Sequence, residues 1–534
     1  MRFLLYWIAF VLACAGLCPA FALDPQTIAR LGTDDPGARI EAIHALVATG
    51  DKAALDLLQA LQDGNASVTP TGQVVFAKGD NIIDAATLTV LTPAPETLEP
   101  IVVNNRLRGT LDAALGALKL LSPERNVRLA SAKAIESTAQ VSLLPLIGKA
   151  LAGESDPAIR ASLEQTKAIL ELKSADPEVR LAAVAMLGRS NQAKTRTLLQ
   201  ALFEKDASGQ FAEADAKVRG AALNAIDDIQ GRLVVSDYAG RLFTGISLGS
   251  ILLLVALGLA ITYGLLGVIN MAHGEMLMIG AYATYVTQQF FKSWLPGYFD
   301  WYLLAAAPVA FLSAALVGMA LERSVIRWLY GRPLETLLAT WGISLFLIQS
   351  VRQIFGAQNV EVANPSWMSG GVELANVVLP YNRIVIIAFS LFVLLAMGWI
   401  LARTRLGLFV RAVTQNRVMA SCVGVPTGRV DLLAFALGSG IAGLAGVALS
   451  QIGNVGPDLG QSYIIDSFMV VVLGGVGQLA GTVYAAMGLG IASKFLEPHI
   501  GAVLTKILVL VLIIAFIQKR PQGLFALKGR AVEA

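Results

Sequence analysis

Residues 243–263, FTGISLGSILLLVALGLAITY, form a long and mostly apolar run. It carries no charged side chain, and its length suits the ~20 apolar residues that a helix needs to cross a bilayer. Further apolar spans follow at roughly 265–290, 302–322, 335–356, 383–402, 432–452, 466–493 and 501–517. The sequence therefore predicts an all-α fold whose main part, residues 241–534, is a polytopic helical membrane domain.

The composition separates this membrane part from a polar part that precedes it. The chain has 534 residues, of which 55% are hydrophobic and 15% charged, and charged side chains are about twice as dense in residues 23–240 as in 241–534. The net charge of +3 is small and no basic stripe is present, which argues against nucleic acid as a partner. Cys14, Cys18 and Cys422 are too few and too scattered for a disulfide framework.

The first 22 residues resemble a secretory signal peptide. Arg2 precedes an apolar run, and small residues at Ala20 and Ala22 form a cleavage pattern after which Leu23 would begin the mature chain. An uncleaved membrane anchor is the alternative. In either case we expect the following domain, residues 23–240, to be exported.

Residues 23–240 contain a repeated helix-start pattern in which Asp-Pro is followed by arginine. It occurs at Asp35, Asp156 and Asp176, with weaker copies at Asn126 and Asp215. Aspartate accepts hydrogen bonds from free N–H groups at a helix start, and proline fits the first helical position. The pattern resembles a HEAT-type array of stacked helix pairs.

The repeat pattern is interrupted between about residues 63 and 108. This stretch is rich in Gly, Thr and Pro and contains the β-branched runs 74–76 and 88–90. We therefore expect a small insertion that contains strands.

Basic residues orient the membrane part. The loops 322–335 and 403–430 are rich in arginine, so they are expected on the cytoplasmic side, whereas 291–301 and 357–382 are expected outside. Counting back, the first span runs inward, which leaves the N-terminal domain outside the membrane, in the periplasm of a bacterial cell.

The basic C-terminal segment, from Lys519 to Arg530, conflicts with eight single crossings, because it should also lie in the cytoplasm. The conflict disappears if 466–493 is a broken hairpin. Its glycines supply the break, since glycine adopts conformations that interrupt a helix; they are Gly474, Gly475, Gly477 and Gly481. One continuous helix is the alternative.

Sequence motifs for catalysis are missing. The chain has no phosphate-binding loop of the Gly-x-x-x-x-Gly-Lys-Ser/Thr type, and its three histidines stand far apart without ligand spacing. We therefore expect no enzyme activity, no metal and no cofactor.

The most informative polar run inside the membrane part is Asn270-Met271-Ala272-His273-Gly274-Glu275. Polar side chains are costly in lipid, so Asn270, His273 and Glu275 should face protein or a water-filled path. They are candidates for a substrate pathway. The alternative is that they cap or cross-link helices.

This run, together with the Gly474–Gly481 region, resembles the LivH-like permeases of branched-chain amino acid ABC importers, over roughly residues 241–530. The exported domain, the segments 338–342 and 451–458, and the C-terminal segment resemble more specifically the urea-transporting subunits of that class, the UrtB type. Residues 417–426 resemble the loop that couples such permeases to their ATPases. By resemblance, Ala420 and Gly424 let a short helix enter a cleft of the ATPase, with Arg411 and Arg417 at its rim; a simple positive-inside loop is the alternative.

The resemblance implies a permease of the bacterial inner membrane that works with a second, LivM-like permease, two ATPases and a periplasmic solute-binding protein. Urea would move inward by alternating access. The alternatives are an importer of branched-chain amino acids or short-chain amides, and, from a different class, a membrane-anchored repeat scaffold or sensor.

Overall fold

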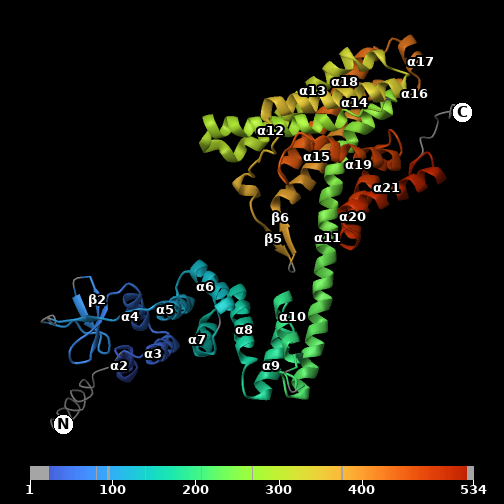
Figure 1. Ribbon diagram of the computed structural model, residues 1–534. Helices are drawn as coiled ribbons and strands as arrows, with labels where there is room; N and C mark the ends of the chain where they lie inside the picture. Colours follow the sequence, from blue (N-terminus) through green and yellow to red (C-terminus); the bar gives the residue numbers. More distant parts are fainter. Residues whose placement is uncertain are drawn as a thin grey trace, which may run out of the picture. The chain divides into compact units, whose positions relative to one another are not determined.

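The computed structural model describes residues 23–79, 81–92, 97–138, 140–205, 207, 209–267, 269–374 and 377–525. The predicted signal peptide, residues 1–22, and the end of the basic C-terminal segment lie outside the described residues. The chain divides into two compact units, with the boundary between Leu233 and Val234 (Figure 1).

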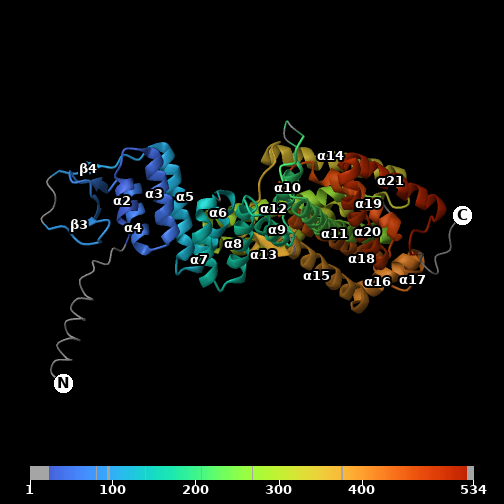
Figure 2. The ribbon, with the colours of Figure 1, turned by 90° about the horizontal axis from the view of Figure 1, so that it is seen from below.

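The first unit consists of short helices that follow one another along the chain, with a small sheet inserted after the third (Figure 2). The helices are α2 (Pro25–Leu31), α3 (Pro36–Thr49), α4 (Lys52–Gln62), α5 (Asn105–Leu118), α6 (Arg125–Thr138), α7 (Leu144–Gly153), α8 (Pro157–Glu171), α9 (Pro177–Leu187) and α10 (Ala193–Gln200). The short 3-10 turns are η1 (Lys119–Leu121), η2 (Val141–Leu143) and η3 (Ala201–Phe203). The long helix α11 (Ala216–Leu266) begins in this unit.

Aspartate caps start several of these helices, as the sequence predicted. Asp35, Asp156 and Asp176 each accept hydrogen bonds from backbone N–H groups of the first turn that follows. Asp215 does the same at the start of α11. At the weaker copy a helix also starts, but Asn126 is not its cap, because α6 begins at Arg125.

Two arginines of the repeat pattern join neighbouring helices through buried glutamates. Arg128 donates to Glu154, which directly precedes α8, at 2.8 and 3.3 Å, and Arg180 donates to Glu213, which precedes α11, at 2.8 Å from two nitrogens. Each arginine also donates to two carbonyls of the loop before its own helix. The arginine hydrogen bonds hold the pKa of both glutamates below the usual 4.5.

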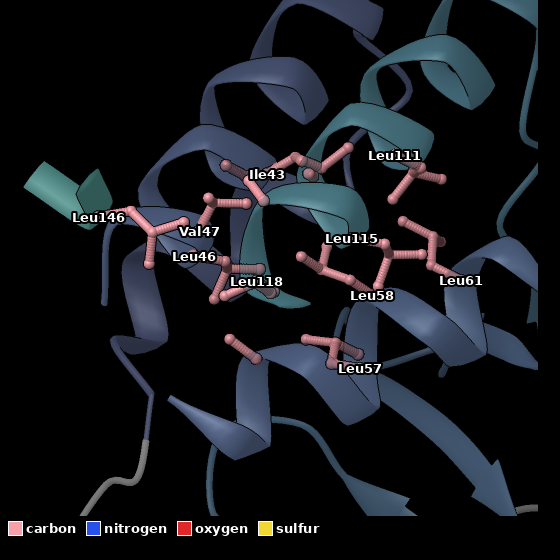
Figure 3. Packing of buried hydrophobic residues seen from close by; sticks show 14 of the residues in the cluster. Ile43, Leu46, Val47, Leu57, Leu58, Leu61, Leu111, Leu115, Leu118 and Leu146 are labelled. Atoms are coloured by element: carbon pink, nitrogen blue, oxygen red, sulfur yellow. The ribbon is translucent and has the colours of Figure 1, made fainter. Parts of the chain in front are cut away.

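The core of the first unit is made of leucine and other aliphatic side chains from α3, α4, α5 and α7 (Figure 3). Leu46, Leu57, Leu111 and Leu146 are all nearly inaccessible to solvent. Burying one such side chain stabilises a fold by roughly 1.5–3 kcal/mol. Since each helix presents only one apolar face, the unit is stable because the helices stack.

The insertion after α4 forms a four-stranded antiparallel sheet in the order β3-β2-β1-β4. The strands are β1 (Ala66–Val68), β2 (Val74–Lys78), β3 (Asn81–Asp84) and β4 (Glu99–Pro100). The strand expected at 74–76 is present, whereas the one expected at 88–90 was wrong. There Asp84 accepts from two N–H groups of a turn and Leu88 has φ of 58°, so the stretch meets β3 only through an isolated bridge at Val90 and the backbone hydrogen bonds of Thr89 and Leu91.

In the described residues, the second unit is a bundle of apolar helices with one hairpin of strands. After α11 come α12 (His273–Trp294), α13 (Tyr302–Ser324), α14 (Pro333–Phe355), α15 (Tyr381–Arg403), α16 (Arg405–Gln415), α17 (Arg417–Cys422), α18 (Thr427–Ser450), α19 (Leu459–Gly474), α20 (Leu479–Ile500) and α21 (Ala502–Lys519). Short 3-10 turns are η4 (Pro296–Trp301), η5 (Ile326–Trp328) and η6 (Ser366–Met368), and the hairpin is β5 (Gly371–Leu374) and β6 (Val377–Pro380). In the described part of the chain, seven helices are long and apolar enough to cross a membrane.

Helix α18 packs closely on both α12 and α13, and the three helices run together in Figure 1. Gly443 of α18 lies where three helix backbones meet: a side chain on Gly280 of α12 would overlap the backbone of Gly443, and a side chain on Gly443 would overlap the backbone of Ala310 in α13. Close backbone contact between helices favours van der Waals packing, which holds helices together in lipid.

Two expected spans are interrupted. In the span 265–290 the chain leaves the helix after Leu266, and α12 starts only at His273. In the span 466–493 helix α19 ends at Gly474 and α20 begins at Leu479, with Gly475 and Gly477 both at positive φ. The chain therefore contains non-helical backbone within two of the segments that looked like single apolar spans.

Candidate functional site

The first interruption turns back along the helix that precedes it. The ring atom Nε2 of His273 lies 3.2 Å from the carbonyl oxygen of Val255, about three turns before the end of α11. Helix α12 therefore begins level with the interior of α11 and not with its end. Such irregular backbone within a membrane bundle is tolerated where protein buries it or where it lines a polar cavity.

Side chains of α14 hold this segment in place. Thr340 accepts a hydrogen bond from the backbone N–H of Met271 at 3.1 Å, and Ser344 donates to Oε1 of Glu275 at 2.8 Å. Thr336, Thr340 and Ser344 recur every four residues, so they share one face of α14, and all three are buried. The opposite face exposes large apolar side chains such as Leu338 and Phe346.

His273 links two helices. Because a carbonyl oxygen can only accept, Nε2 carries the proton in the contact with Val255, and Nδ1 is left as an acceptor. A side chain on Gly258 would lie 3.0 Å from the ring of His273, so the ring packs on bare backbone of α11. For this residue the geometry fits the cross-linking alternative directly.

Three polar atoms of this run have no hydrogen-bond partner among the described residues. They are Nδ2 of Asn270, Nδ1 of His273 and Oε2 of Glu275, on side chains that are at most 2% exposed. Buried polar atoms are rarely left unpaired, because that costs about 1–3 kcal/mol each. One donor and two acceptor positions within six residues thus form the candidate site.

The start of α19 closes this site from another side. A side chain on Gly274 would lie 2.6 Å from the carbonyl oxygen of Gly460, so the first turns of α12 and α19 touch backbone to backbone. Helix α19 also begins after a non-helical segment, residues 451–458. Broken helices whose ends meet inside a bundle are typical of the substrate sites of membrane transporters.

The segment 451–458 is fixed by polar contacts of its own. Gln451 is hydrogen-bonded to the hydroxyl of buried Tyr302, and its backbone carbonyl accepts from Asn382 at 3.0 Å. At the other end, Arg352 donates to both carboxylate oxygens of Asp458, at 2.8 and 2.9 Å. These contacts tie α13, α14 and α15 to the segment that leads into α19.

The basic loop 403–430 contains two short helices, α16 and α17, and the stretch that resembles a coupling loop, residues 417–426, comprises α17 and the turn after it. Apolar side chains project from this basic loop into open space: Leu408, Val418, Met419 and Val423. Ala420 is buried, and Gly424 has φ of 86°, which suits glycine where α17 ends. Exposed apolar patches that are rimmed by polar residues mark interaction surfaces.

The two arginines of this loop differ in placement. Arg411 is exposed on α16 and donates to the carbonyl of Leu401 at 3.0 Å. Arg417 turns inward, where both of its terminal nitrogens contact the carboxylate of fully buried Asp431.

The predicted helix-break glycines are used in different ways. Gly474 ends α19, Gly475 and Gly477 lie in the interruption, and Gly481 lies inside α20, where its backbone touches Gly474. A side chain on Gly264, near the end of α11, would lie 2.8 Å from Gly477. The topology of the proposed hairpin stays a prediction.

Sequence reasoning missed Thr340, Ser344 and Asp431 as functional residues. Their signal was weak: a four-residue spacing of hydroxyls in an apolar helix, and one acid at the border of an apolar span. No group of three metal-ligating side chains occurs among the described residues.

A bundle of membrane-spanning helices that encloses broken helices and buried, unpaired polar atoms defines a multi-pass membrane transport protein. Residues 241–517, just over half of the chain, match the family described as branched-chain amino acid transport system / permease component. The chain belongs to this family.

Individual relatives agree with the family. The high-affinity branched-chain amino acid transport system permease protein BraD of Pseudomonas aeruginosa is 29% identical over 297 residues, which cover 54% of this chain and 96% of BraD. LivH of Escherichia coli K12 is 30% identical over 292 residues, covering 53% and 94%. A probable LivH of Methanocaldococcus jannaschii is 24% identical over 321 residues, covering 55% and 95%.

The chain is thus a permease subunit of an ATP-binding cassette importer and an integral, multi-pass protein of the inner membrane. It is not an enzyme, because ATP is hydrolysed by partner ATPase subunits, and the family implies a second permease and a solute-binding protein as further partners. The relatives are matched almost end to end, whereas nearly half of this chain lies outside the match.

Proposed function

We propose that this permease carries urea inward, past the site formed by Asn270, His273 and Glu275. The observation that carries the proposal is the set of unpaired polar atoms on these side chains. Urea has one carbonyl acceptor and four N–H donors and bears no charge. Its carbonyl can accept from Nδ2 of Asn270, and its N–H groups can donate to Oε2 of Glu275 and Nδ1 of His273.

A neutral amide suits this site because it has both a hydrogen-bond acceptor and donors to pair with the unpaired atoms. It also adds no charge beside the carboxylate of Glu275. A site that leaves buried donors and acceptors unpaired discriminates strongly against solutes that cannot satisfy them. The likeness of segments 338–342 and 451–458 to urea-transporting subunits supports the same solute. Thr340 of the first segment holds the site, and Asp458 of the second precedes α19.

A branched-chain amino acid is the second candidate solute. The relatives are named for such transport, and the carboxylate of Glu275 is an available partner for an ammonium group. The two solutes are separated by measuring uptake of labelled urea and labelled leucine in cells that lack this chain. Loss of urea uptake alone, restored by the wild-type chain, supports the proposal; loss of leucine uptake alone contradicts it.

The helices α16 and α17 would dock on the partner ATPases. Their exposed apolar side chains and the tight end of α17 at Gly424 support this role. Gly424 lies in open space but at positive φ, so Gly424→Trp strains the end of α17 and places bulk on the docking face. Uptake should be abolished while membrane insertion persists, and unchanged uptake would contradict the coupling role.

We place the N-terminal domain in the periplasm as a HEAT-like array, with the C-terminus in the cytoplasm and residues 466–493 as a hairpin. Single cysteines at exposed Asn454 and His499 should then both react with an impermeant thiol reagent, and a cysteine at exposed Met419 should not. The background chain has its native cysteines replaced. Labelling at 454 but not at 499 would indicate a single crossing and contradict the hairpin.

A further inference from the structure

A chain of polar contacts leads from the half-exposed Arg417 of the candidate coupling helix to buried carboxylates of two membrane helices. Arg417, the first residue of α17, contacts both carboxylate oxygens of Asp431 in α18, and its guanidinium lies over the ring of Tyr330, 4.8 Å from the centroid. The hydroxyl of Tyr330 donates to Oε1 of Glu322, near the end of α13, at 3.0 Å. Asp431 and Glu322 are 0% and 2% exposed.

Arginine is suited to this position in a way that lysine is not. Its planar guanidinium binds a carboxylate through two parallel contacts and stacks on an aromatic face at the same time. These restraints fix the direction of the side chain as well as its distance. Any displacement of the start of α17 must therefore move Asp431 and Tyr330 with it or break the contacts.

The restrained helices lead to the candidate substrate site. Ile326 and Phe435 form a small buried cluster with Leu321 and Tyr330, so α13 and α18 are also packed together beside the polar chain. Farther along, Gly443 of α18 touches both α12 and α13 through their backbones. Packed interfaces of this kind switch between discrete arrangements and do not deform continuously, so they carry a movement over a distance.

We propose that Arg417 is a positioning residue that transmits movement of the ATPases from α17 to α13 and α18, and so to the start of α12. Asp431, Tyr330 and Glu322 are its partners. The proposal rests on the coupling role given above for α16 and α17. It assigns Arg417 a role in linking hydrolysis to transport, whereas the exposed apolar side chains of α17 serve attachment of the ATPases.

The test compares the number of solute molecules carried per ATP hydrolysed in the reconstituted complex of this chain with its partner subunits. Arg417→Lys keeps the charge but loses the paired contacts and the stacking, and Tyr330→Phe loses only the link to Glu322. We expect the ratio to fall roughly tenfold in Arg417→Lys, within the range of usual coupling free energies, and less in Tyr330→Phe, with hydrolysis nearly unchanged. Arg429→Lys, at an exposed arginine in the first turn of α18, is the matched control and should keep the wild-type ratio.

Three results would overturn the proposal. An unchanged ratio in Arg417→Lys would show that the ion pair only stabilises the fold. A parallel loss of hydrolysis and transport, or failure of the ATPases to co-purify, would show that Arg417 serves attachment. A wild-type ratio in Tyr330→Phe would remove α13 from the transmission.

The outcome is separable from the choice of solute. The ratio of solute carried to ATP hydrolysed is measured with urea and with leucine. If only leucine is transported, the proposed solute is wrong, and the role of Arg417 is tested by comparing the ratio for leucine in the wild type and in Arg417→Lys. If the wild-type complex carries neither, the proposed function fails. The role of Arg417 is then read from ATP-dependent labelling of a cysteine at Asn454, which Arg417→Lys should abolish if the proposal is right and leave intact if it is wrong.

Discussion

The two units of this chain use polar side chains over different distances. In the first unit, Asp35, Asp156 and Asp176 bond to the N–H groups of the turns that follow them directly. In the second unit, the partner of Glu275 is Ser344, 69 residues later, and the partner of Tyr302 is Gln451, 149 residues later. In the first unit, a sequence motif therefore predicts the hydrogen bond that its aspartate makes. In the second unit, a motif identifies a polar residue but not the residue that it contacts.

The first unit also contains longer contacts, such as that of Lys149 with the carbonyl of Thr49, and two of the others follow a rule. Arg128 and Arg180 each bind the glutamate that stands two residues before the cap of a later helix, Glu154 before Asp156 and Glu213 before Asp215. Arg160 departs from the rule, since it pairs with Glu164 of its own helix. The contrast predicts that substitutions in the first unit have local effects and that those in the second affect several helices.

The largest effect is expected where helix backbones touch in the second unit. Gly280→Leu must separate α12 from α18 and should cost at least the ~1–3 kcal/mol of an overpacked core, seen as loss of folded chain in detergent. Gly342→Leu is the matched control, because a side chain there meets open space. Equal yields of the two variants would contradict the importance of this contact.

A smaller but specific effect is expected at the candidate site. Glu275→Gln replaces the carboxylate by an amide. When the amide nitrogen takes the place of Oε2, it is a donor that faces the donor N–H groups of urea, so the hydrogen bond is lost. Initial uptake should fall about tenfold or more, since hydrogen bonds to charged groups contribute about 1.5–3 kcal/mol. Glu361→Gln, at an exposed carboxylate, should leave uptake unchanged. Equal activity of both variants would remove Glu275 from the pathway.

The arginine contacts of the first unit should make it sensitive to acid. The pKa of Glu154 in the folded protein lies below its usual 4.5, chiefly because Arg128 donates to it. The contact therefore stabilises the folded unit fully above pH 4.5, and this stabilisation is lost as the pH falls through the lower pKa of the folded state. Amide hydrogen exchange at residues 154–160, corrected for intrinsic rates, should rise below about pH 4.5. Glu154→Gln should raise it already at neutral pH, whereas Glu164→Gln should not; the reverse order would refute the account.

The smallest effect is expected at a single cap. Asp176→Ala should destabilise the start of α9 by about 1 kcal/mol, because Asp176 accepts from the N–H of Glu178. Asp51→Ala is a close control, since Asp51 occupies the same position before α4 but makes no capping hydrogen bond. Hydrogen exchange in the first turn of α9 should increase more than in the first turn of α4, and no difference would show that the caps contribute little.

The sequence separation between contacting residues also explains which features could be predicted from the sequence. The membrane spans, the aspartate caps and the strand at 74–76 were predictable, because hydrophobic length and local capping determine them. The turn back along α11 was not, since no local signal reveals that His273 will meet Val255. Ser344 and Asp431 were missed for the same reason: one hydroxyl or acid in an apolar helix becomes informative only when its partner is known.

Transport by the purified complex would identify the solute of this permease. Proteoliposomes that contain this chain with its partner permease and ATPases, supplied with the solute-binding protein, are given ATP and labelled urea or labelled leucine. We expect ATP-dependent accumulation of urea, strongly reduced by Glu275→Gln, and no accumulation of leucine. Accumulation of leucine without urea, or urea entry that does not require ATP, would contradict it.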